Sequence, residues 1–342
     1  MSAGNDACHS ITPDNARHVP VMLAEVMDLL KPQAGRRYLD GTLGLGGHSS
    51  EIMRLTQGNA LLCGLDRDPQ ALKRAEETLR PFLDSCRLFL CEYADFAAKL
   101  DSLGWDSVDG ALLDIGVSSL QIDVAGRGFS FHEDAPLDMR MDMGGFSHEG
   151  RPAWTASAWH LVNEAPVQEL ARIIDAYGED PMAGRIAKAI QRARESSPIE
   201  TTGQLAGIVC GAYPPKWRKT ARNHPATRTF QAIRMAVNDE LGQLEKFLGS
   251  ILSRLAPGGR LVIITFHSLE DRIVKQAFRL WSTECLCPPG LPVCTCGHKA
   301  EARLLTRKPI LPSEAELFAN SRAGSAKLRA IEKITPQQGR RL

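Results

Sequence analysis

A glycine-rich segment at residues 40–48 is the first part of the chain whose residue types could do chemistry. It reads Asp-Gly-Thr-Leu-Gly-Leu-Gly-Gly-His, follows a predicted strand and leads into a predicted helix. Glycines let the backbone approach a ligand closely, and a helix N-terminus offers free N–H groups. Asp66 ends the next predicted strand, 20 residues after Gly46, where a carboxylate can bind ribose hydroxyls. Asp66 could instead cap the helix that follows, but Asp68 is better placed to do so. The pattern predicts a cofactor that contains a nucleoside.

Two further carboxylates favour one kind of nucleoside cofactor. Asp40 stands at the start of the glycine-rich segment, and Asp114 ends another predicted strand. A carboxylate in this position would repel the pyrophosphate of a dinucleotide. S-adenosylmethionine presents an ammonium group and a sulfonium group instead, and acids attract both. The charges therefore favour methyl transfer over hydride transfer.

The elements that must position these residues are those of an α/β fold. Short apolar runs alternate with helical patterns up to Gln121, which is typical of a parallel sheet. We predict strands at 38–39, 60–66, 87–91, 109–114 and 260–265. Between these groups of strands the chain shows helical patterns and polar loops without a buried strand. The sequence therefore predicts one α/β domain, residues 1–122 and 223–342, interrupted by a mostly helical insertion at 123–222.

Composition limits the partners and the compartment. The 342 residues include 41 basic and 40 acidic ones, so the net charge is +1 and no overall field attracts nucleic acid. The first 20 residues lack the pattern of a signal peptide, no run of about 18 apolar residues occurs, and most of the nine cysteines are scattered. We therefore expect a soluble, cytoplasmic protein with no membrane partner.

One local stretch is strongly basic. Residues 201–238 contain no acidic residue, and Trp217, His224 and Phe230 are interleaved with the bases. The basic residues are Lys216, Arg218, Lys219, Arg222, Arg228 and Arg234. Such a stretch can be an ordinary solvated face, but in a neutral protein this asymmetry favours contacts with RNA phosphates.

Four cysteines form a separate cluster in the sequence. Cys285, Cys287, Cys294 and Cys296 lie within the segment CLCPPGLPVCTCG. Four thiolates can hold one zinc ion, but the Cys-x-Cys spacing differs from the usual Cys-x-x-Cys pair. Reduced thiols and a redox-labile loop are the alternatives.

Several motifs together resemble one enzyme family. They are HVPVMLAEV, DGTLGLGGHS, GLDRDPQAL, LLDIGVSS, GRGFSF, PLDMRMD, HPATRTFQAIR and FHSLEDRIVK. Between His18 and about Lys333 the chain is similar to the RsmH (MraW) family, which methylates N4 of a cytidine in 16S ribosomal RNA. The resemblance implies a class I Rossmann-like fold and S-adenosylmethionine as the cofactor. It also implies cytidine 1402, at the decoding centre of the small ribosomal subunit, as the target.

The resemblance also implies which residues bind the cofactor. They are Gly46, Gly47, His48, Asp66, Tyr93, Asp114 and Gln121, with Asp66 at the ribose and Tyr93 near the adenine. Tyr93 replaces the phenylalanine of some members, so its hydroxyl needs a hydrogen-bond partner. Leu120 stands where proline is frequent. We expect no metal in the reaction, because family members without the four clustered cysteines exist.

The reaction requires that the target amine be held and the base unstacked. We expect Asp114, with Ser118 and Ser119, to accept hydrogen bonds from N4, because the Asp/Asn-Pro-Pro-aromatic motif of DNA amino-methyltransferases is missing here. Phe129, Phe131 or His267 could hold the flipped base. For the two phenylalanines, packing in a core is an equally good interpretation.

Two other functions stay open at this point. One is an amino-methyltransferase that acts on another nucleic acid, and the other is a non-catalytic ribosome-assembly factor that keeps a cofactor fold. The intact Gly46, Gly47, Asp66 and Asp114 favour an enzyme. The sequence leaves open whether the protein forms a homodimer.

Overall fold

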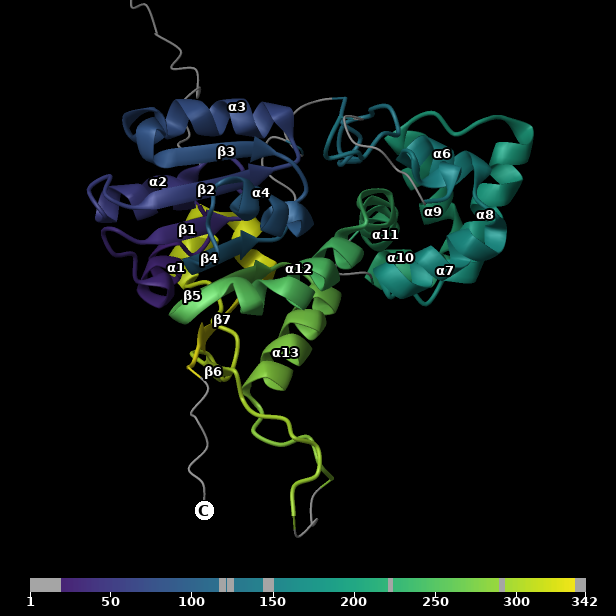
Figure 1. The fold of residues 1–342 in the computed structure, drawn as a ribbon. Helices are drawn as coiled ribbons and strands as arrows, with labels where there is room; N and C mark the ends of the chain where they lie inside the picture. The colour runs from purple at the N-terminus through teal and green to yellow at the C-terminus, as the bar shows by residue number, and fades with distance from the viewer. Residues whose placement is uncertain are drawn as a thin grey trace, which may run out of the picture.

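A single seven-stranded sheet organises the part of the chain that carries the glycine-rich segment. The computed structural model in Figure 1 describes residues 20–116, 121, 126–143, 151–220, 224–288 and 293–335. Its strands are β1 (Arg37–Asp40), β2 (Leu61–Asp66), β3 (Cys86–Leu90), β4 (Val108–Asp114), β5 (Leu255–Thr265), β6 (Ala302–Leu304) and β7 (Lys327–Lys333). The order is β3-β2-β1-β4-β5-β7-β6, in which β1 to β5 are parallel and β7 runs antiparallel to β5 and β6. This order confirms the predicted Rossmann-like fold.

Helices cover both faces of the sheet, as a parallel sheet requires. Because successive side chains of a strand point to opposite faces, Leu62 and Leu112 pack on one face while Cys63 and Leu113 pack on the other. The first face is covered by α1 (Leu23–Leu30), α2 (Gly47–Leu55) and α3 (Pro69–Thr78). The second is covered by α4 (Phe96–Ser102), α12 (Glu240–Arg254) and α13 (Ser268–Ser282). Asp68 caps α3 as predicted, since its side chain accepts a hydrogen bond from the N–H of Gln70 at 2.9 Å.

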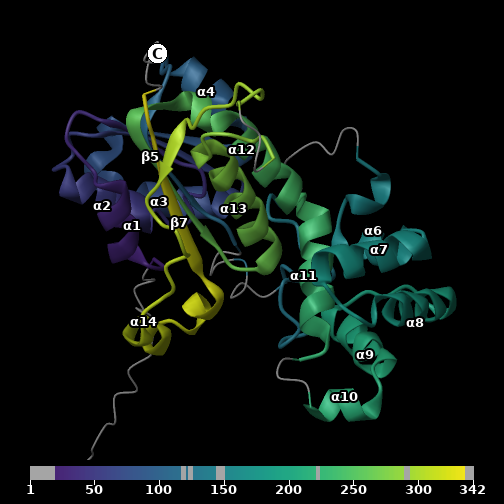
Figure 2. The ribbon, with the colours of Figure 1, turned by 90° about the horizontal axis from the view of Figure 1, so that it is seen from below.

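A separate group of helices follows β4. It consists of α6 (Ala158–Glu164), α7 (Val167–Gly178), α8 (Ala183–Ser196), α9 (Thr202–Ala212), α10 (Pro215–Thr220) and α11 (Ala226–Asn238). These helices form a lobe beside the sheet (Figures 1 and 2) and, except for α10, share a core of their own that includes Ile173, Ile190 and Ile233. The core begins at Leu137 and reaches Val237.

The end of this lobe differs from the boundary expected at residue 222. Helix α11 packs within the lobe, and α12 packs on the sheet. Between them Asp239 has a φ of +51°, which interrupts what the sequence presents as one long helix. We therefore propose that the insertion ends after Asn238.

The remaining elements are short. They are η1 (Arg80–Ser85), η2 (Tyr93–Asp95), η3 (Ala153–Thr155), α14 (Glu314–Ala319) and η4 (Ser321–Ser325). Within the described ranges, each helix is too short or too polar to cross a membrane.

Candidate functional site

The glycine-rich segment forms the floor of a cavity at the carboxyl ends of β1, β2 and β4. Gly46 has a φ of +80° and precedes the first residue of α2. A Cβ atom on Gly47 would lie 2.3 Å from Cγ of Pro20, so the segment that leads into α1 packs directly on this glycine. The close approach that the structure shows at Gly47 is therefore to the chain itself, and the approach of the glycines to a ligand stays a prediction.

The cavity brings together most of the predicted site residues. Those that line it are Gly47, His48, Asp66, Tyr93, Asp114 and Gln121. Gly46 is adjacent but does not line it, and neither does His267. Ser118 and Ser119 lie outside the described residues.

Asp114 has the least satisfied carboxylate in the cavity. Its Oδ1 atom is buried and has no hydrogen-bond partner in the described part of the chain, while Oδ2 lies 3.9 Å from Nδ1 of His48. Burial, together with the charges of Asp40 and Glu270, raises the pKa of Asp114 to about 7. A buried acceptor without a donor is unfavourable, so this oxygen is suited to an ammonium or amine of a ligand.

Asp66 is held in a fixed orientation by the backbone. Its carboxylate accepts hydrogen bonds from the N–H of Gly44 at 2.7 Å and from that of Asp68 at 2.8 Å. Burial raises its pKa to about 6. Each carboxylate oxygen keeps acceptor capacity toward the cavity, which suits ribose hydroxyls.

Asp40 lies beneath the glycine-rich segment. It is 1% exposed and accepts hydrogen bonds from Oγ of Ser49 at 2.7 Å and from the N–H of Thr42 at 3.2 Å. Burial raises its pKa to about 6. The residue therefore fixes the segment and acts on the cavity only through its charge, which helps to raise the pKa of Asp114.

Tyr93 supplies the aromatic side of the cavity. Its ring packs edge-on against Phe247, with the centroids 5.8 Å apart. The hydroxyl finds the partner it needs, because it donates a hydrogen bond to the carbonyl oxygen of Glu240 at 3.2 Å. A flat, fixed ring in this place suits an adenine, and this role stays a prediction.

His267 has a structural task that the sequence did not show. It caps α13, and its Nε2 lies 2.8 Å from Oε1 of Glu270. The preceding residue, Phe266, lines the cavity instead. His267 itself does not line the cavity, so its role at the target base stays a prediction.

The two phenylalanines of the GRGFSF motif pack against the helical lobe. The ring of Phe131 stacks on His224 at 4.6 Å and meets Phe230 at 4.9 Å. Phe129 lies 5.7 Å from the guanidinium of Arg127. Neither lines the cavity, so their packing supports the core interpretation.

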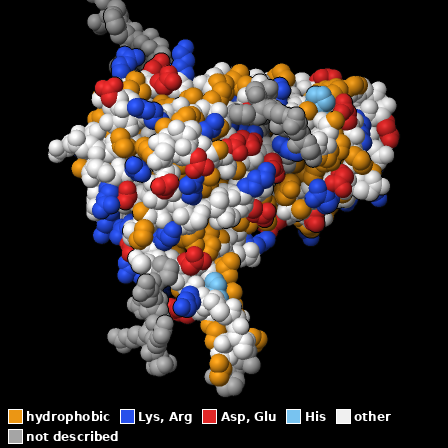
Figure 3. Space-filling model, viewed as in Figure 1, with side chains coloured by type: hydrophobic (Ala, Val, Ile, Leu, Met, Phe, Trp, Pro, Cys, Tyr) orange, Lys and Arg blue, Asp and Glu red, His pale blue; other side chains and the backbone are white. Residues whose placement is uncertain are grey.

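Two residues of the basic stretch, Arg228 and Arg234, are engaged in contacts within the protein, while Arg222 and the side chains of Arg218 and Lys219 lie outside the described part of the chain. The side chain of Arg234 is only 15% exposed and forms a two-bond ion pair with Glu240, with both distances 2.7 Å, so the prediction that it belongs to an exposed RNA-binding surface is wrong. Arg228 donates to the carbonyl oxygen of Glu179. On the face in Figure 3, basic side chains are interspersed with acidic ones.

Sequence reasoning missed cavity residues on later elements. Glu240 and Gln243 of α12 line the cavity and are almost fully buried. Their signal in the sequence is that they share a helical face with the apolar Leu244 and Phe247. Two polar residues in an apolar stripe indicate a buried polar site.

Comparison with known proteins places the chain in a family. The model of the MraW methylase family matches residues 15–334. The chain belongs to the MraW methylase family. A family member from Nitratidesulfovibrio vulgaris strain DP4, named ribosomal RNA small subunit methyltransferase H, is 59% identical over 322 residues, 94% of this chain and 97% of that one. One of the same name from Lawsonia intracellularis is 54% identical, over 93% of this chain and 99% of its own length.

Proposed function

We propose that this protein methylates N4 of cytidine 1402 in 16S ribosomal RNA within the small ribosomal subunit. As a member of the MraW methylase family it is a methyltransferase that depends on S-adenosylmethionine. The name of its relatives supports ribosomal RNA of the small subunit as the substrate. The target atom and position are supported by the family motifs in the sequence. The observation that carries the chemistry is the unpartnered Oδ1 of Asp114.

The residues of the cavity fit the cofactor. Asp66 would hold the ribose hydroxyls, Tyr93 would face the adenine, and Gly47 and His48 would lie under the amino-acid part. When bound, S-adenosylmethionine supplies a methyl group on a positively charged sulfur. Burial and the nearby carboxylates Asp40 and Glu270 raise the pKa of Asp114, so the positive charge of the bound cofactor would favour its ionised form.

Asp114 is proposed to hold the target amine. Cytosine N4 is a weak nucleophile because its lone pair is delocalised into the ring, so the amine must be oriented toward the methyl group. Oδ1 of Asp114 can accept a hydrogen bond from N4. Transfer forms the nitrogen–carbon bond, breaks the carbon–sulfur bond and releases one N4 proton. The carboxylate of Asp114, which burial makes more basic than an exposed aspartate, is the proposed acceptor of that proton.

The test is transfer of labelled methyl from S-adenosylmethionine to small ribosomal subunits. Subunits from a strain that lacks this gene should accept about one methyl per subunit, and mass mapping should place it on N4 of cytidine 1402. Subunits from the parent strain are the control and should accept almost none. Label on another nucleotide, on DNA or on protein, or no label, would contradict the proposal.

Substitution of Asp114 tests its role in this reaction. We expect Asp114→Asn to lower kcat by about 10²-fold or more, because the amide is a weaker acceptor and no base. Asp109→Asn is the matched control, since Asp109 lies near the opposite end of β4 in a surface ion pair with Arg36. Full turnover together with unchanged cofactor affinity in Asp114→Asn would refute the assignment.

A further inference from the structure

The loop between α13 and β6 carries a cluster that the methyl-transfer site does not use. The loop projects from the edge of the sheet (Figure 1), and none of its described residues, 283–288 and 293–301, lines the cofactor cavity. Its base is fixed to α13, because Nε2 of His298 lies 3.0 Å from the carbonyl oxygen of Leu280 and the N–H of Glu301 donates to that of Trp281. Cys285, Cys287, Cys294 and Cys296 lie beyond this base.

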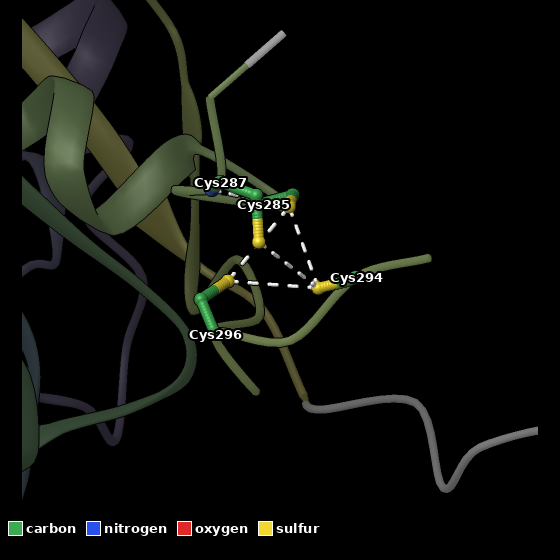
Figure 4. Close-up of side chains that lie close together, drawn as sticks. All are labelled: Cys285, Cys287, Cys294 and Cys296. Atoms are coloured by element: carbon green, nitrogen blue, oxygen red, sulfur yellow. Dashed lines mark hydrogen bonds between the residues drawn. The ribbon is translucent and has the colours of Figure 1, made fainter. Parts of the chain in front are cut away.

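The four sulfur atoms are spaced as in a tetrahedral metal site (Figure 4). The Sγ atoms of Cys285 and Cys294 are 3.4 Å apart, those of Cys294 and Cys296 are 3.5 Å apart, and Cys285 to Cys296 measures 3.7 Å. The distance from Cys287 to Cys294 is 4.0 Å. Zinc–sulfur bonds of about 2.3 Å at tetrahedral angles give sulfur–sulfur distances of about 3.8 Å, whereas a disulfide requires about 2.05 Å.

The backbone explains the unusual Cys-x-Cys spacing. The chain bends at Cys287 and at Cys296, and the two sulfurs of the second Cys-x-Cys segment lie only 3.5 Å apart. The two segments also donate N–H groups to the sulfurs. Leu286 donates to Cys296 at 3.3 Å, Cys287 to Cys285 at 3.4 Å, and Thr295 to Cys287 at 3.4 Å. Such bonds favour thiolates, the form of cysteine that binds metal.

The described part of the loop has no hydrophobic core of its own. None of the described residues at 283–288 and 293–299 is buried, and its largest apolar side chains, Leu286 and Val293, are 51% and 70% exposed. A segment without a hydrophobic core needs a covalent or metal cross-link to keep one conformation. The sulfur atoms are too far apart for a disulfide, so a metal ion is the cross-link that fits these distances.

We propose that Cys285, Cys287, Cys294 and Cys296 bind one Zn²⁺ ion in a closed structural site that folds this loop. The four thiols release four protons to solvent as they bind, and no oxidant or reductant takes part. Four protein ligands leave no open coordination position, so the ion has no part in methyl transfer. The zinc site therefore stands independently of the proposed function.

Metal analysis of the full-length protein tests this site. Protein purified without chelators should contain about one zinc per chain, and replacement by Co²⁺ should give the visible absorption of a tetrahedral cobalt–thiolate site. Cys285→Ser and Cys296→Ser should each lower the zinc content several-fold. Cys210→Ser, in α9 and outside the cluster, should keep it. Iron in place of zinc, a disulfide found by mass, or no metal after reconstitution with Zn²⁺ would overturn the proposal.

A second measurement covers the case in which the variants fail to fold. In the wild-type protein a strong chelator should speed tryptic cleavage at the exposed Lys299, and added Zn²⁺ should restore protection. Far-ultraviolet circular dichroism should stay constant, because the residues that the structure describes between α13 and β6 form no helix or strand. Cleavage that is equally fast with and without chelator would contradict a zinc-folded loop.

Discussion

At the scale of single residues, hydrogen-bond partners decide what each carboxylate in or beneath the cavity does. The sequence places Asp40, Asp66 and Asp114 at strand ends, and this position alone predicts a site there. It could not show that Asp40 fixes the glycine-rich segment through Ser49 while Asp114 keeps an unpartnered oxygen. These differences depend on which atoms of distant segments meet, and neither residue type nor spacing encodes that directly.

The raised pKa of Asp114 predicts a conflict between activity and stability. Its pKa is about 7 in the folded protein and near 3.8 when the chain is unfolded, so the folded state binds more protons between these values. The contribution of this group to stability is therefore largest at low pH and is lost as the pH rises toward 7. Above pH 7, Asp114→Asn should melt a few degrees higher than the wild-type protein without cofactor.

The measurement is the difference in Tm between Asp114→Asn and the wild-type protein from pH 5 to pH 8. The difference in Tm should shrink toward pH 5. There the carboxyl of Asp114 in the folded wild-type protein is protonated and therefore uncharged, like the amide of the variant. Taking a difference cancels groups such as Asp271, whose pKa is lowered by Arg329. A variant that is less stable than the wild-type protein at pH 8 would mean that ionised Asp114 already has a stabilising partner.

At the scale of elements, the parts that could be predicted are those with a strong local signal. Each of the five parallel strands contains an apolar run, and Asp68 with Pro69 marks the start of α3. The strands β6 and β7 escaped prediction because they are short or mixed in polarity. The cavity residues of α12 escaped as well, since only the packing of α12 on the sheet brings them to the strand ends.

The contact between the glycine-rich segment and Pro20 predicts the effect of one methyl group. Gly47→Ala would place a Cβ atom 2.3 Å from Cγ of Pro20, so the segment before α1 must move. Because Pro20 and Val21 line the cavity, we expect the dissociation constant for S-adenosylmethionine to rise about tenfold or more. The measurement is calorimetric titration of the purified variant.

Gly184→Ala is the control for this substitution. Gly184 lies in α8, and no atom lies within 4 Å of its added Cβ. Alanine there should leave cofactor binding unchanged and stabilise the helix by up to about 1 kcal/mol. Unchanged cofactor binding in Gly47→Ala would show that the Pro20 segment moves without disturbing the cavity.

At the scale of the whole molecule, polar contacts join the helical lobe to the sheet domain. Arg127, which precedes the lobe, forms a buried ion pair with Asp68, the residue that caps α3. The same guanidinium donates to the carbonyl oxygen of Met141 at 2.8 Å. Asn238, at the end of the lobe, accepts a hydrogen bond from Arg67 through its backbone oxygen. Both ends of the lobe are therefore attached next to the cofactor cavity, which Arg67 and Met141 line.

Arg127→Ala should uncouple the two parts of the molecule. Removal of one partner leaves the carboxylate of Asp68 buried without its charge partner, at a cost of about 3–5 kcal/mol. We expect a lower Tm and a split of the calorimetric transition into two, because the lobe has a hydrophobic core of its own. Arg172→Ala, which breaks an exposed ion pair with Glu169 on α7, should cost less than about 1 kcal/mol and keep one transition. A single transition in Arg127→Ala with an unchanged Tm would show that the apolar contacts, rather than this ion pair, join the lobe to the sheet domain.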